Sequence, residues 1–309
     1  MKENPYAACR LCARRCGADR TAGETGYCRM GDRAVVARAA LHFWEEPPIS
    51  GTRGSGAIFF CGCSLGCIYC QNRGIARADA GVAIGVPRLA AILSELQAQG
   101  AHNVNFVTPT HFVPSVIEAV GMARAAGMTL PVVYNTGSYE LPETVDMLAG
   151  TVDVFLPDLK YATAKTAAAY SHAKDYPEVA RAAIARMVRL APEPVIDGEG
   201  IMRRGVLVRV LLLPEHLAEA KLSVSYLYKT YGDSVYISLM NQYTPPASMP
   251  RPLDRPVTRA EYEDLLEYAD RIGVKNAFVQ ESGTQTERFL PRFDGSGVLR
   301  PEKKEASPP

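Results

Sequence analysis

The chain has 309 residues, of which 47% are apolar, and its formal net charge is +1. A near-neutral chain has no general electrostatic reason to bind nucleic acid or a membrane surface. No apolar run approaches the length of a membrane span, and the first residues lack the apolar core of a secretion signal. All eight cysteines fall within the first seventy residues, which is typical of a cytoplasmic metal-binding protein rather than of a disulfide-stapled one.

The first group of cysteines has the spacing C-x2-C-x3-C-x11-C on a short, glycine-rich segment. Its members are Cys9, Cys12, Cys16 and Cys28. The segment is too short to build a core of its own, so a bound metal would hold it together. Four thiolates suit either a tetrahedral zinc ion or a second iron–sulfur cluster, and zinc is slightly favoured over the cluster. We place this cysteine-rich module, with a linker, in residues 1–50.

Residues 34–50 are expected to connect this module to the rest of the chain. The pair Pro47-Pro48 and the glycines after it are typical of a loop. We expect Glu45 to lie on a surface crossing and Trp44 to be packed, and we leave the role of His42 open.

The strand-like run Ala57–Cys61 leads into a second group of cysteines, Cys63, Cys67 and Cys70, with the spacing C-x3-C-x2-C. Iron–sulfur clusters normally take four thiolates, so a three-cysteine loop leaves one iron open for a substrate or cofactor unless it borrows a ligand. A zinc site would need a second C-x2-C pair, and a disulfide is unfavourable in a reducing compartment. Cys61 is expected to be a buried neighbour rather than a fourth ligand.

This motif, with the aromatic Tyr69 before its last cysteine, resembles the radical S-adenosylmethionine (SAM) superfamily. The wider chain, from about Cys9 to about Gln280, is similar to a subgroup of pyruvate formate-lyase-activating-like proteins. The blocks that carry this similarity are Glu45–Gly51, Val107–Phe112, Val133–Thr136 and Leu156–Tyr161. The resemblance implies a radical SAM oxidoreductase in which a 4Fe-4S cluster reductively cleaves SAM. The resulting 5′-deoxyadenosyl radical would abstract a hydrogen from the substrate.

Beyond the cysteine loop, short apolar runs alternate with helical patterns. The expected strands are Ala57–Cys61, Val104–Thr108, Pro131–Asn135, Val152–Leu156, Leu207–Leu213, Val235–Met240 and Ala277–Gln280. The expected helices are Arg88–Gln99, a stripe over Val116–Ala123, a stripe over Val179–Leu190, and Arg259–Ile272.

Successive β–α units predict an α/β fold with a parallel sheet, because each parallel crossover needs a helix. A doubly wound sheet and a barrel both fit this pattern. The resemblance selects the partial (β/α)6 TIM-like barrel of the superfamily. We place this barrel in residues 51–294 and a disordered tail in residues 295–309.

In parallel barrels the working residues lie at the carboxyl ends of the strands. Polar residues occur where the apolar runs stop: Thr108, Thr110 and His111; Asn135 and Thr136; Asp158 and Lys160; and Asn241, Gln242 and Tyr243. Arg209 alternates with apolar neighbours inside a strand, so its side chain could point into the barrel.

The resemblance gives several of these residues roles around SAM. Asp158-Leu159-Lys160 is similar to the D-x-K segment of glycyl-radical activating enzymes, which lies beside SAM. Lys160 would neutralise the SAM carboxylate, and Asp158 would face the sulfonium or a bound cation. Arg209 resembles the arginine of a V-R-x-x-x-x-P strand and would contact SAM. An ordinary ion pair at a strand end is the alternative for Asp158 and Lys160.

Thr108, Thr110 and His111 occupy the place where many members carry a Gly-Gly-Glu segment that holds the SAM amino group. This chain lacks that glutamate, so threonine hydroxyls and main-chain carbonyls would substitute, and a structural role is the alternative for His111. Asn135 and Thr136 would contact the methionyl end of SAM. Tyr69 also belongs to the cofactor-binding set. Asn241, Gln242 and Tyr243 are candidates for substrate binding.

Three functions remain. The chain is an activase that installs a glycyl radical on a partner enzyme, a radical SAM enzyme that modifies a small molecule or another protein side chain, or a non-catalytic iron–sulfur or zinc protein. The polar residues at the strand ends argue against the third. The resemblance implies a low-potential electron donor such as flavodoxin or ferredoxin, and either a glycyl radical enzyme or another protein as partner. No nucleic-acid or membrane partner is expected.

Overall fold

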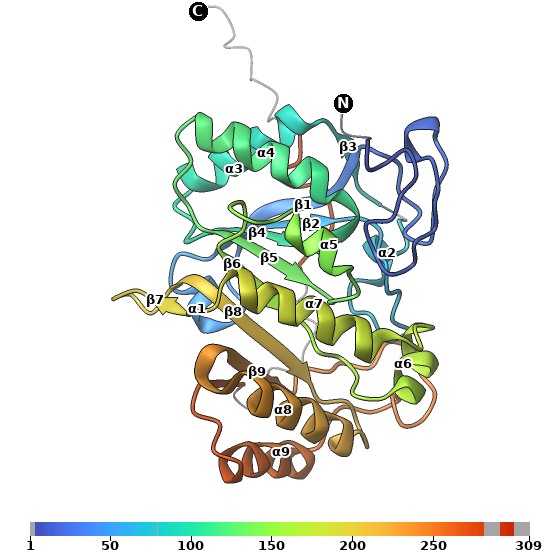
Figure 1. Cartoon of the computed structure of the whole chain (residues 1–309), viewed down its shortest axis with the longest axis vertical. Helices are drawn as coiled ribbons and strands as arrows, with labels where there is room; N and C mark the ends of the chain where they lie inside the picture. Colours follow the sequence, from blue (N-terminus) through green and yellow to red (C-terminus); the bar gives the residue numbers. More distant parts are fainter. Residues whose placement is uncertain (1–3, 79, 281–290, 300–309) are drawn as a thin grey trace, which may run out of the picture.

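The computed structural model describes residues 4–78, 80–280 and 291–299. A single sheet runs through it in the order β10-β9-β8-β6-β5-β4-β2-β1-β3, as Figure 1 shows. Neighbouring strands from β2 to β10 in this order are parallel, whereas β1 and β3 at the other edge are antiparallel. The predicted α/β fold is confirmed as a mostly parallel, open sheet that corresponds to a partial TIM-like barrel.

The strands expected from the apolar runs are all present. They are β2 (Ser55–Phe60), β4 (Val104–Val107), β5 (Val132–Thr136), β6 (Val154–Pro157), β8 (Met202–Leu211), β9 (Tyr236–Met240) and β10 (Ala277–Val279). Three strands were not expected: β1 (Ala34–His42), β3 (Val82–Ile84) and β7 (Val195–Ile196). Strand β1 pairs with β2, so the first half of the expected linker belongs to the sheet.

Helices follow most of the parallel strands, as a partial barrel requires. In the described part of the chain they are α1 (Pro47–Ser50), α2 (Arg73–Ala76), α3 (Val86–Ala98), α4 (Val113–Ala125), α5 (Pro142–Asp146), α6 (Ala164–Ser171), α7 (Tyr176–Leu190), α8 (Leu217–Tyr231) and α9 (Arg259–Arg271). Single 3-10 turns are η1 (Arg20–Ala22), η2 (Thr110–Phe112) and η3 (Gly232–Ser234). None of the described helices is long and apolar enough to cross a membrane.

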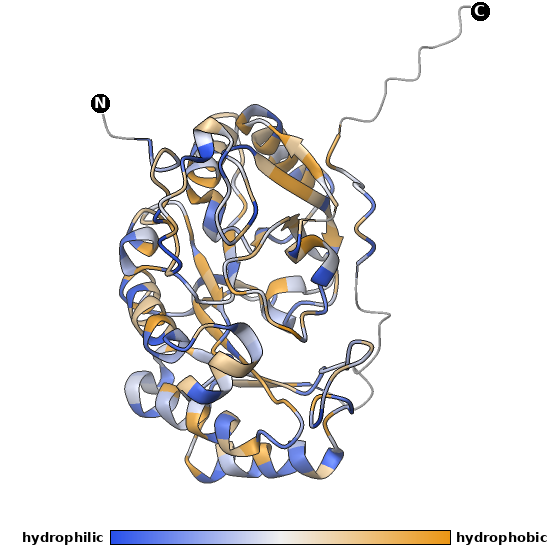
Figure 2. Cartoon of the chain, turned by 90° about the vertical axis from the view of Figure 1, so that its right-hand side faces the viewer, coloured by the Kyte–Doolittle hydropathy of each residue, from blue (hydrophilic) through white to orange (hydrophobic). Residues whose placement is uncertain are grey.

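The four helices predicted from apolar stripes are confirmed as α3, α4, α7 and α9. Helix α8 was not expected because its buried face is made partly of small residues, Ala220 and Ser223. In Figure 2 the strands are mostly hydrophobic, whereas the helices alternate between hydrophobic and hydrophilic residues. This alternation is typical of helices that cover a sheet and face water on the other side.

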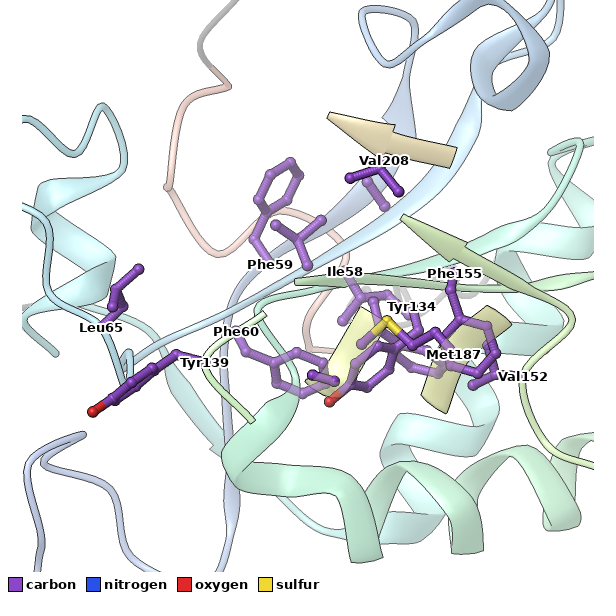
Figure 3. Close-up of a cluster of buried hydrophobic side chains, with 14 of the residues drawn as sticks. Ile58, Phe59, Phe60, Leu65, Tyr134, Tyr139, Val152, Phe155, Met187 and Val208 are labelled. Carbon is purple, nitrogen blue, oxygen red and sulfur yellow. The ribbon is translucent and has the colours of Figure 1, made fainter. Parts of the chain in front are cut away.

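The main core fills the layer between the sheet and these helices. Figure 3 shows Ile58 and Phe60 of β2 in this layer with Tyr134 of β5 and Phe155 of β6. Met187 of α7 packs onto the same cluster. Because side chains alternate along a strand, the residues between these core positions face the inside of the barrel.

The inside of the barrel is closed at one end by α1. Ile49 of α1 is fully buried among interior side chains of β5, β6 and β8, namely Val133, Val154, Leu156, Met202 and Leu207. The next interior positions are two residues further along these strands, at Asn135, Asp158 and Arg209. An apolar floor therefore lies directly beneath a polar layer.

Residues 295–298 pack against β1. The Gly295 N–H donates to the carbonyl of Ala37, and the Ala39 N–H donates to that of Ser296, both at 2.9 Å. Val298 is fully buried. Residues 295–299 thus differ from the expected disordered tail, and residues 300–309, the rest of that tail, lie outside the described residues.

We predict that Ile49→Ala lowers the free energy of unfolding by about 2–5 kcal/mol, because it opens a cavity in a closed apolar floor. Chemical denaturation of the full chain measures this value. Leu222→Ala on α8 is the control, since this side chain is 53% exposed and should stay within about 0.5 kcal/mol of wild type. An equally small effect of Ile49→Ala would show that α1 does not close the barrel.

Candidate active site

A cavity of about 250 Å³ opens where the parallel strands end. It is bounded by the loop after β2, by the carboxyl ends of β4, β5, β6, β8 and β9, and by the segment before α1. The residues that sequence reasoning selected and that line it are Cys63, Cys67, Tyr69, Cys70, Thr108, Thr110, Asn135, Thr136, Asp158, Lys160, Arg209, Gln242 and Tyr243. Most of the predicted site is therefore brought together in one place.

The three cysteines of the loop interact with one another across the cavity wall. Burial raises the pKa of Cys63, and it raises the pKa of Cys70 to about 12; the charge of Cys67 adds to both shifts. The Leu65 N–H lies 3.4 Å from the Cys63 sulfur, and the Ser171 hydroxyl lies 3.1 Å from the Cys67 sulfur. Such hydrogen bonds tune iron–sulfur clusters.

The three thiols at this end of the cavity are a suitable donor set for an iron–sulfur cluster. A four-iron cluster spaces its thiolate ligands farther apart than a single ion does, because iron and sulfide lie between them. Three thiols around one cavity, within electrostatic reach of one another, fit three of the four ligand positions of such a cluster.

Cys61 does not reach the cavity. Its thiol is fully buried, burial raises its pKa to about 11, and its sulfur donates to the carbonyl of Ala80 at 2.9 Å. The prediction that it is a buried neighbour is confirmed.

Gly62, the next residue, has φ +83, and a Cβ there would lie 2.6 Å from the Cys28 carbonyl oxygen. The cysteine loop thus packs directly on the N-terminal segment and needs a glycine to do so. In Figure 1 the N-terminal segment, in dark blue, lies on the side of the sheet to which the arrowheads of β5 and β8 point.

A chain of ion pairs leads from the cysteine loop into the barrel. Lys160 Nζ lies 2.5 Å from Asp158, and Asp158 lies 2.7 Å from Arg209 Nε. Arg209 Nη1 is 3.2 Å from Glu45. Lys160 is the end near the cysteines, since its charge acts on the thiols of Cys63 and Cys70.

Asp158, in the middle of this series of ion pairs, is ionised. Burial would raise the pKa of Asp158, but the charges of Arg209 and Lys160 outweigh burial and lower it. Burial would lower the pKa of Lys160, but the charges of Asp158 and Cys67 raise it. The cavity therefore presents fixed positive and negative charges side by side, out of bulk water.

Glu45 belongs to this site, and the expectation that it lies on a surface crossing is wrong. Its side chain is 9% exposed, and it accepts hydrogen bonds from Arg209 and from Asn135 Nδ2, the latter at 3.1 Å. Trp44, expected to be packed, is 59% exposed, and it lines the cavity together with His42. The acidic residues beside two prolines are typical of a surface loop, and no local signal shows that this loop turns into the barrel.

A second carboxylate that sequence reasoning missed, Glu140, holds two of the cavity threonines, Thr110 and Thr136. Thr110 donates to it at 3.0 Å, Thr136 donates to the same oxygen, and the hydroxyl of Tyr134 donates to the other oxygen at 2.9 Å. Glu140 also forms an isolated antiparallel bridge with Cys12, so it ties the N-terminal segment to the site. No motif marks this loop residue after β5.

The side chains of Thr108 and His111, which follow the end of β4, point in different directions. Thr108 lines the cavity with φ +58, a left-handed conformation that is unusual for a β-branched residue. His111 does not line it. Its Nε2 donates to the carbonyl of Cys61 at 2.7 Å, and burial lowers its pKa to about 3. His111, a residue of turn η2, thus makes the structural contact that was the alternative to its expected cofactor-binding role.

The remaining predicted residues lie on the aromatic side of the cavity. Tyr69 is buried and packs edge-on against Tyr161, Tyr170 and Tyr243, with ring centroids 6.0–6.4 Å apart. Asn241, a substrate-binding candidate, does not line the cavity, whereas its two neighbours do. The aromatic side chains restrict water on this side of the site.

The model of the Radical SAM superfamily matches residues 57–198. This match spans the cysteine loop and the strands whose ends carry Thr108, Asn135 and Asp158. The match supports membership of the radical SAM superfamily, and a domain of this kind indicates an enzyme. Membership implies a 4Fe-4S cluster and SAM as its cofactors.

Known proteins resemble this chain in sequence or in fold. An uncharacterized protein of Methanocaldococcus jannaschii is 28% identical over 284 residues, which cover 89% of this chain and 78% of that protein. The structure of HydG, a maturase of the FeFe-hydrogenase, has a TM-score of 0.53 at 13% identity and covers 82% of this chain and 57% of HydG. It shares the fold alone.

The structure of Streptococcus suis SuiB bound to precursor peptide SuiA has a TM-score of 0.48 at 13% identity and covers 72% of this chain. The present chain spans 47% of SuiB and 57% of HydG, about half the length of each of these two proteins.

We predict that Cys61→Ala retains the wild-type iron content after anaerobic reconstitution, because its sulfur faces away from the cavity. Cys63→Ala should lose about four irons, since two thiolates do not hold a 4Fe-4S cluster stably. Iron analysis and the visible absorption spectrum measure both. Equal losses in the two variants would mean that Cys61 is a ligand.

Proposed function

We propose that this chain is a radical SAM oxidoreductase whose 4Fe-4S cluster is held by Cys63, Cys67 and Cys70. When bound, the cluster supplies the electron that cleaves SAM to methionine and a 5′-deoxyadenosyl radical, which takes a hydrogen from the substrate. One observation carries the proposal: a three-thiol loop and a buried chain of opposite charges line one cavity. SAM carries both a carboxylate and positive charges, so such a wall suits it.

Lys160 and Asp158 are the residues proposed to face SAM. The ammonium of Lys160 lies at the cysteine end of the ion-pair chain and suits the SAM carboxylate. Asp158, between two cations, stays ionised and offers a negative charge to the sulfonium. Thr108, Thr110, Asn135, Thr136 and Tyr69 are proposed as the walls of the same subsite.

Arg209, which the resemblance makes a SAM contact, is better explained as a positioning residue. Each of its three guanidinium nitrogens already donates to the protein: Nε to Asp158, Nη1 to Glu45 and Nη2 to Asn135, the last at 2.6 Å. These contacts fix the carboxylate of Asp158 and the amide of Asn135 at the cavity wall. A preorganised wall of this kind needs no rearrangement when the ligand binds.

We also propose that Cys9, Cys12, Cys16 and Cys28 hold a metal centre, either zinc or a second cluster. Burial raises the pKa of Cys12 to about 12, and the other three thiols add to this shift, so all four lie within electrostatic reach. Metal binding would displace their protons.

Arg20 supports an anionic centre at these cysteines. Its guanidinium is 1% exposed, lies 3.6 Å from the Cys9 sulfur and donates to the carbonyls of Met30, Gly31 and His111. In the described part of the chain no carboxylate lies within ion-pair distance of it. A buried cation needs a counter-charge, and thiolates bound to a metal would supply one.

The N-terminal segment also fixes the cysteine loop. Arg14 donates to the carbonyls of Ser64 and Leu65 at 2.9 and 3.3 Å, and through Nη1 to that of His172 at 2.8 Å. Either metal at the N-terminal cysteines would therefore brace the wall of the active-site cavity. We favour a structural role for it.

For the substrate, we propose a protein partner, with a glycyl radical enzyme first and another protein side chain or a small molecule as alternatives. Phe43 and Trp44 are 48% and 59% exposed near the cavity and offer apolar contacts to a partner loop. A low-potential donor such as flavodoxin or ferredoxin would supply the electron. A glycyl-radical signal on a co-incubated partner would separate the activase role from action on a small molecule.

We predict that the anaerobically reconstituted, reduced chain converts SAM to methionine and 5′-deoxyadenosine. Lys160→Met should lower the product by at least about tenfold while the cluster absorbance stays, because the carboxylate of SAM loses its counter-charge. Lys165→Met, an exposed position on α6, is the control and should match wild type. Liquid chromatography measures both products. No 5′-deoxyadenosine from wild type would refute the proposed function, and an unimpaired Lys160→Met would refute the role of Lys160.

The metal of the N-terminal module is tested with the double variant Cys9→Ala, Cys12→Ala. Loss of zinc with iron retained is expected for a structural zinc site. Loss of about four irons would identify a second cluster. Elemental analysis of the purified chain distinguishes the two, and an unchanged content of both metals would mean that the four cysteines bind none.

A further inference from the structure

The sulfur of Cys67 accepts a hydrogen bond from a side chain outside the cysteine loop. The hydroxyl of Ser171, the last residue of α6, donates to it at 3.1 Å. The sulfur of Cys63, in contrast, faces a main-chain donor, the N–H of Leu65. When Cys67 is a cluster ligand its sulfur is a thiolate, which accepts hydrogen bonds and donates none. The chemistry of the ligand therefore fixes the direction of the contact with Ser171.

Tyr161 stands behind Ser171 as a second donor. Its hydroxyl lies 2.6 Å from that of Ser171, and both side chains are fully buried. A serine hydroxyl has one proton. Because that proton is directed to Cys67, the hydroxyl of Tyr161 must donate to the oxygen of Ser171. A donor that itself accepts a hydrogen bond is polarised, so it binds its own acceptor more strongly.

The hydroxyl of Ser171 does not serve its own helix. A serine in a helix can bond the carbonyl four residues before it. In the described part of the chain, the partners of this hydroxyl are Cys67 and Tyr161 instead. The helix ends directly afterwards, where His172 has φ +48. A capping role within α6 thus does not explain the hydroxyl, whereas a role toward the cysteine does.

Main-chain contacts hold the end of α6 against the cysteine loop. The N–H of Ile68 donates to the carbonyl of Tyr170 at 2.9 Å. Arg14 joins the same two segments, since its Nη2 donates to the carbonyl of Ser171 at 3.1 Å and its Nε to that of Ser64 at 2.9 Å. The donors of a guanidinium have a fixed geometry. The hydroxyl is therefore held at its place beside the sulfur.

A hydrogen bond at this sulfur favours the reduced form of a cluster. Reduction adds one negative charge, which the thiolate ligands share, and a donor to a ligand sulfur stabilises that charge and raises the reduction potential. Burial makes the effect larger, because water does not screen the contact. Neither Ser171 nor Tyr161 lines the cavity, so their effect would reach the cluster without contact to SAM or substrate.

We propose that Ser171 and Tyr161 are positioning residues that raise the reduction potential of the cluster through the sulfur of Cys67. The inference rests on the proposed function, because it takes Cys67 as a ligand of a 4Fe-4S cluster. It goes beyond that function by naming the side chains outside the motif that make the cluster easier to reduce.

The test is a redox titration of the anaerobically reconstituted full chain without SAM, followed by electron paramagnetic resonance. The signal to follow is the one that Cys63→Ala loses, which assigns it to the cysteine loop. Ser171→Ala should keep its iron and lower the ratio of reduced to oxidised cluster at a fixed potential by at least about threefold. This change equals a shift of about 30 mV to lower potential for a one-electron couple.

Tyr161→Phe keeps the aromatic ring and removes only the second donor. It should shift the potential in the same direction by a smaller amount, and it carries the test if Ser171→Ala loses iron. Ser115→Ala is the matched control. The buried hydroxyl of Ser115 on α4 lies 2.9 Å from that of Tyr6, so this variant breaks a serine–tyrosine contact away from the cysteine loop. Its potential should equal that of wild type.

Wild-type potentials in both Ser171→Ala and Tyr161→Phe, at full iron content, would overturn this inference alone. An equal shift in Ser115→Ala would also overturn it, because the loss of any buried serine contact would then have the same effect. Wild type that holds no cluster on the three cysteines would refute the proposed function as well.

Discussion

The site depends on one buried guanidinium. Arg209 rises from β8 into the barrel and joins Asp158 after β6, Asn135 of β5 and Glu45 before α1. Removing one partner of a buried ion pair typically costs about 3–5 kcal/mol, because the other charge is left uncompensated. Arg209 therefore couples the strands of the sheet to the segment that closes the barrel floor. The position of the polar layer above the apolar layer around Ile49 follows from this contact.

This arrangement gives the cavity two chemically different ends. Lys160 and the three cysteines form the end where a cluster and the carboxylate of SAM fit, and Glu45, paired with Arg209, forms the other end. The N-terminal segment supports the first end through the clamp of Arg14 and the close approach of Cys28 to Gly62. Radical chemistry needs both a fixed reaction geometry and exclusion of water, and a braced cavity with aromatic walls provides both.

The parallel strands and the cysteine loop were predictable because both signals are local. Continuous apolar runs mark strands covered on both faces, and thiolate spacing marks a shared ligand set. Glu45 was not predictable, since its burial comes from Arg209, 164 positions away in the sequence. Glu140 shows the same limit, because its partners come from different elements. Because His111 follows the end of β4, the sequence correctly placed it at the edge of the sheet that carries the site. The direction of its side chain, however, depends on turn η2.

The central claim is that SAM binds at the three-cysteine loop beside Lys160, and electron paramagnetic resonance of the reduced, reconstituted chain tests it most directly. A ligand on the open iron changes the spectrum of the reduced cluster. We predict a clear spectral change when SAM is added to wild type, and a much smaller change in Lys160→Met at the same SAM concentration. Identical spectra of wild type with and without SAM would contradict the claim.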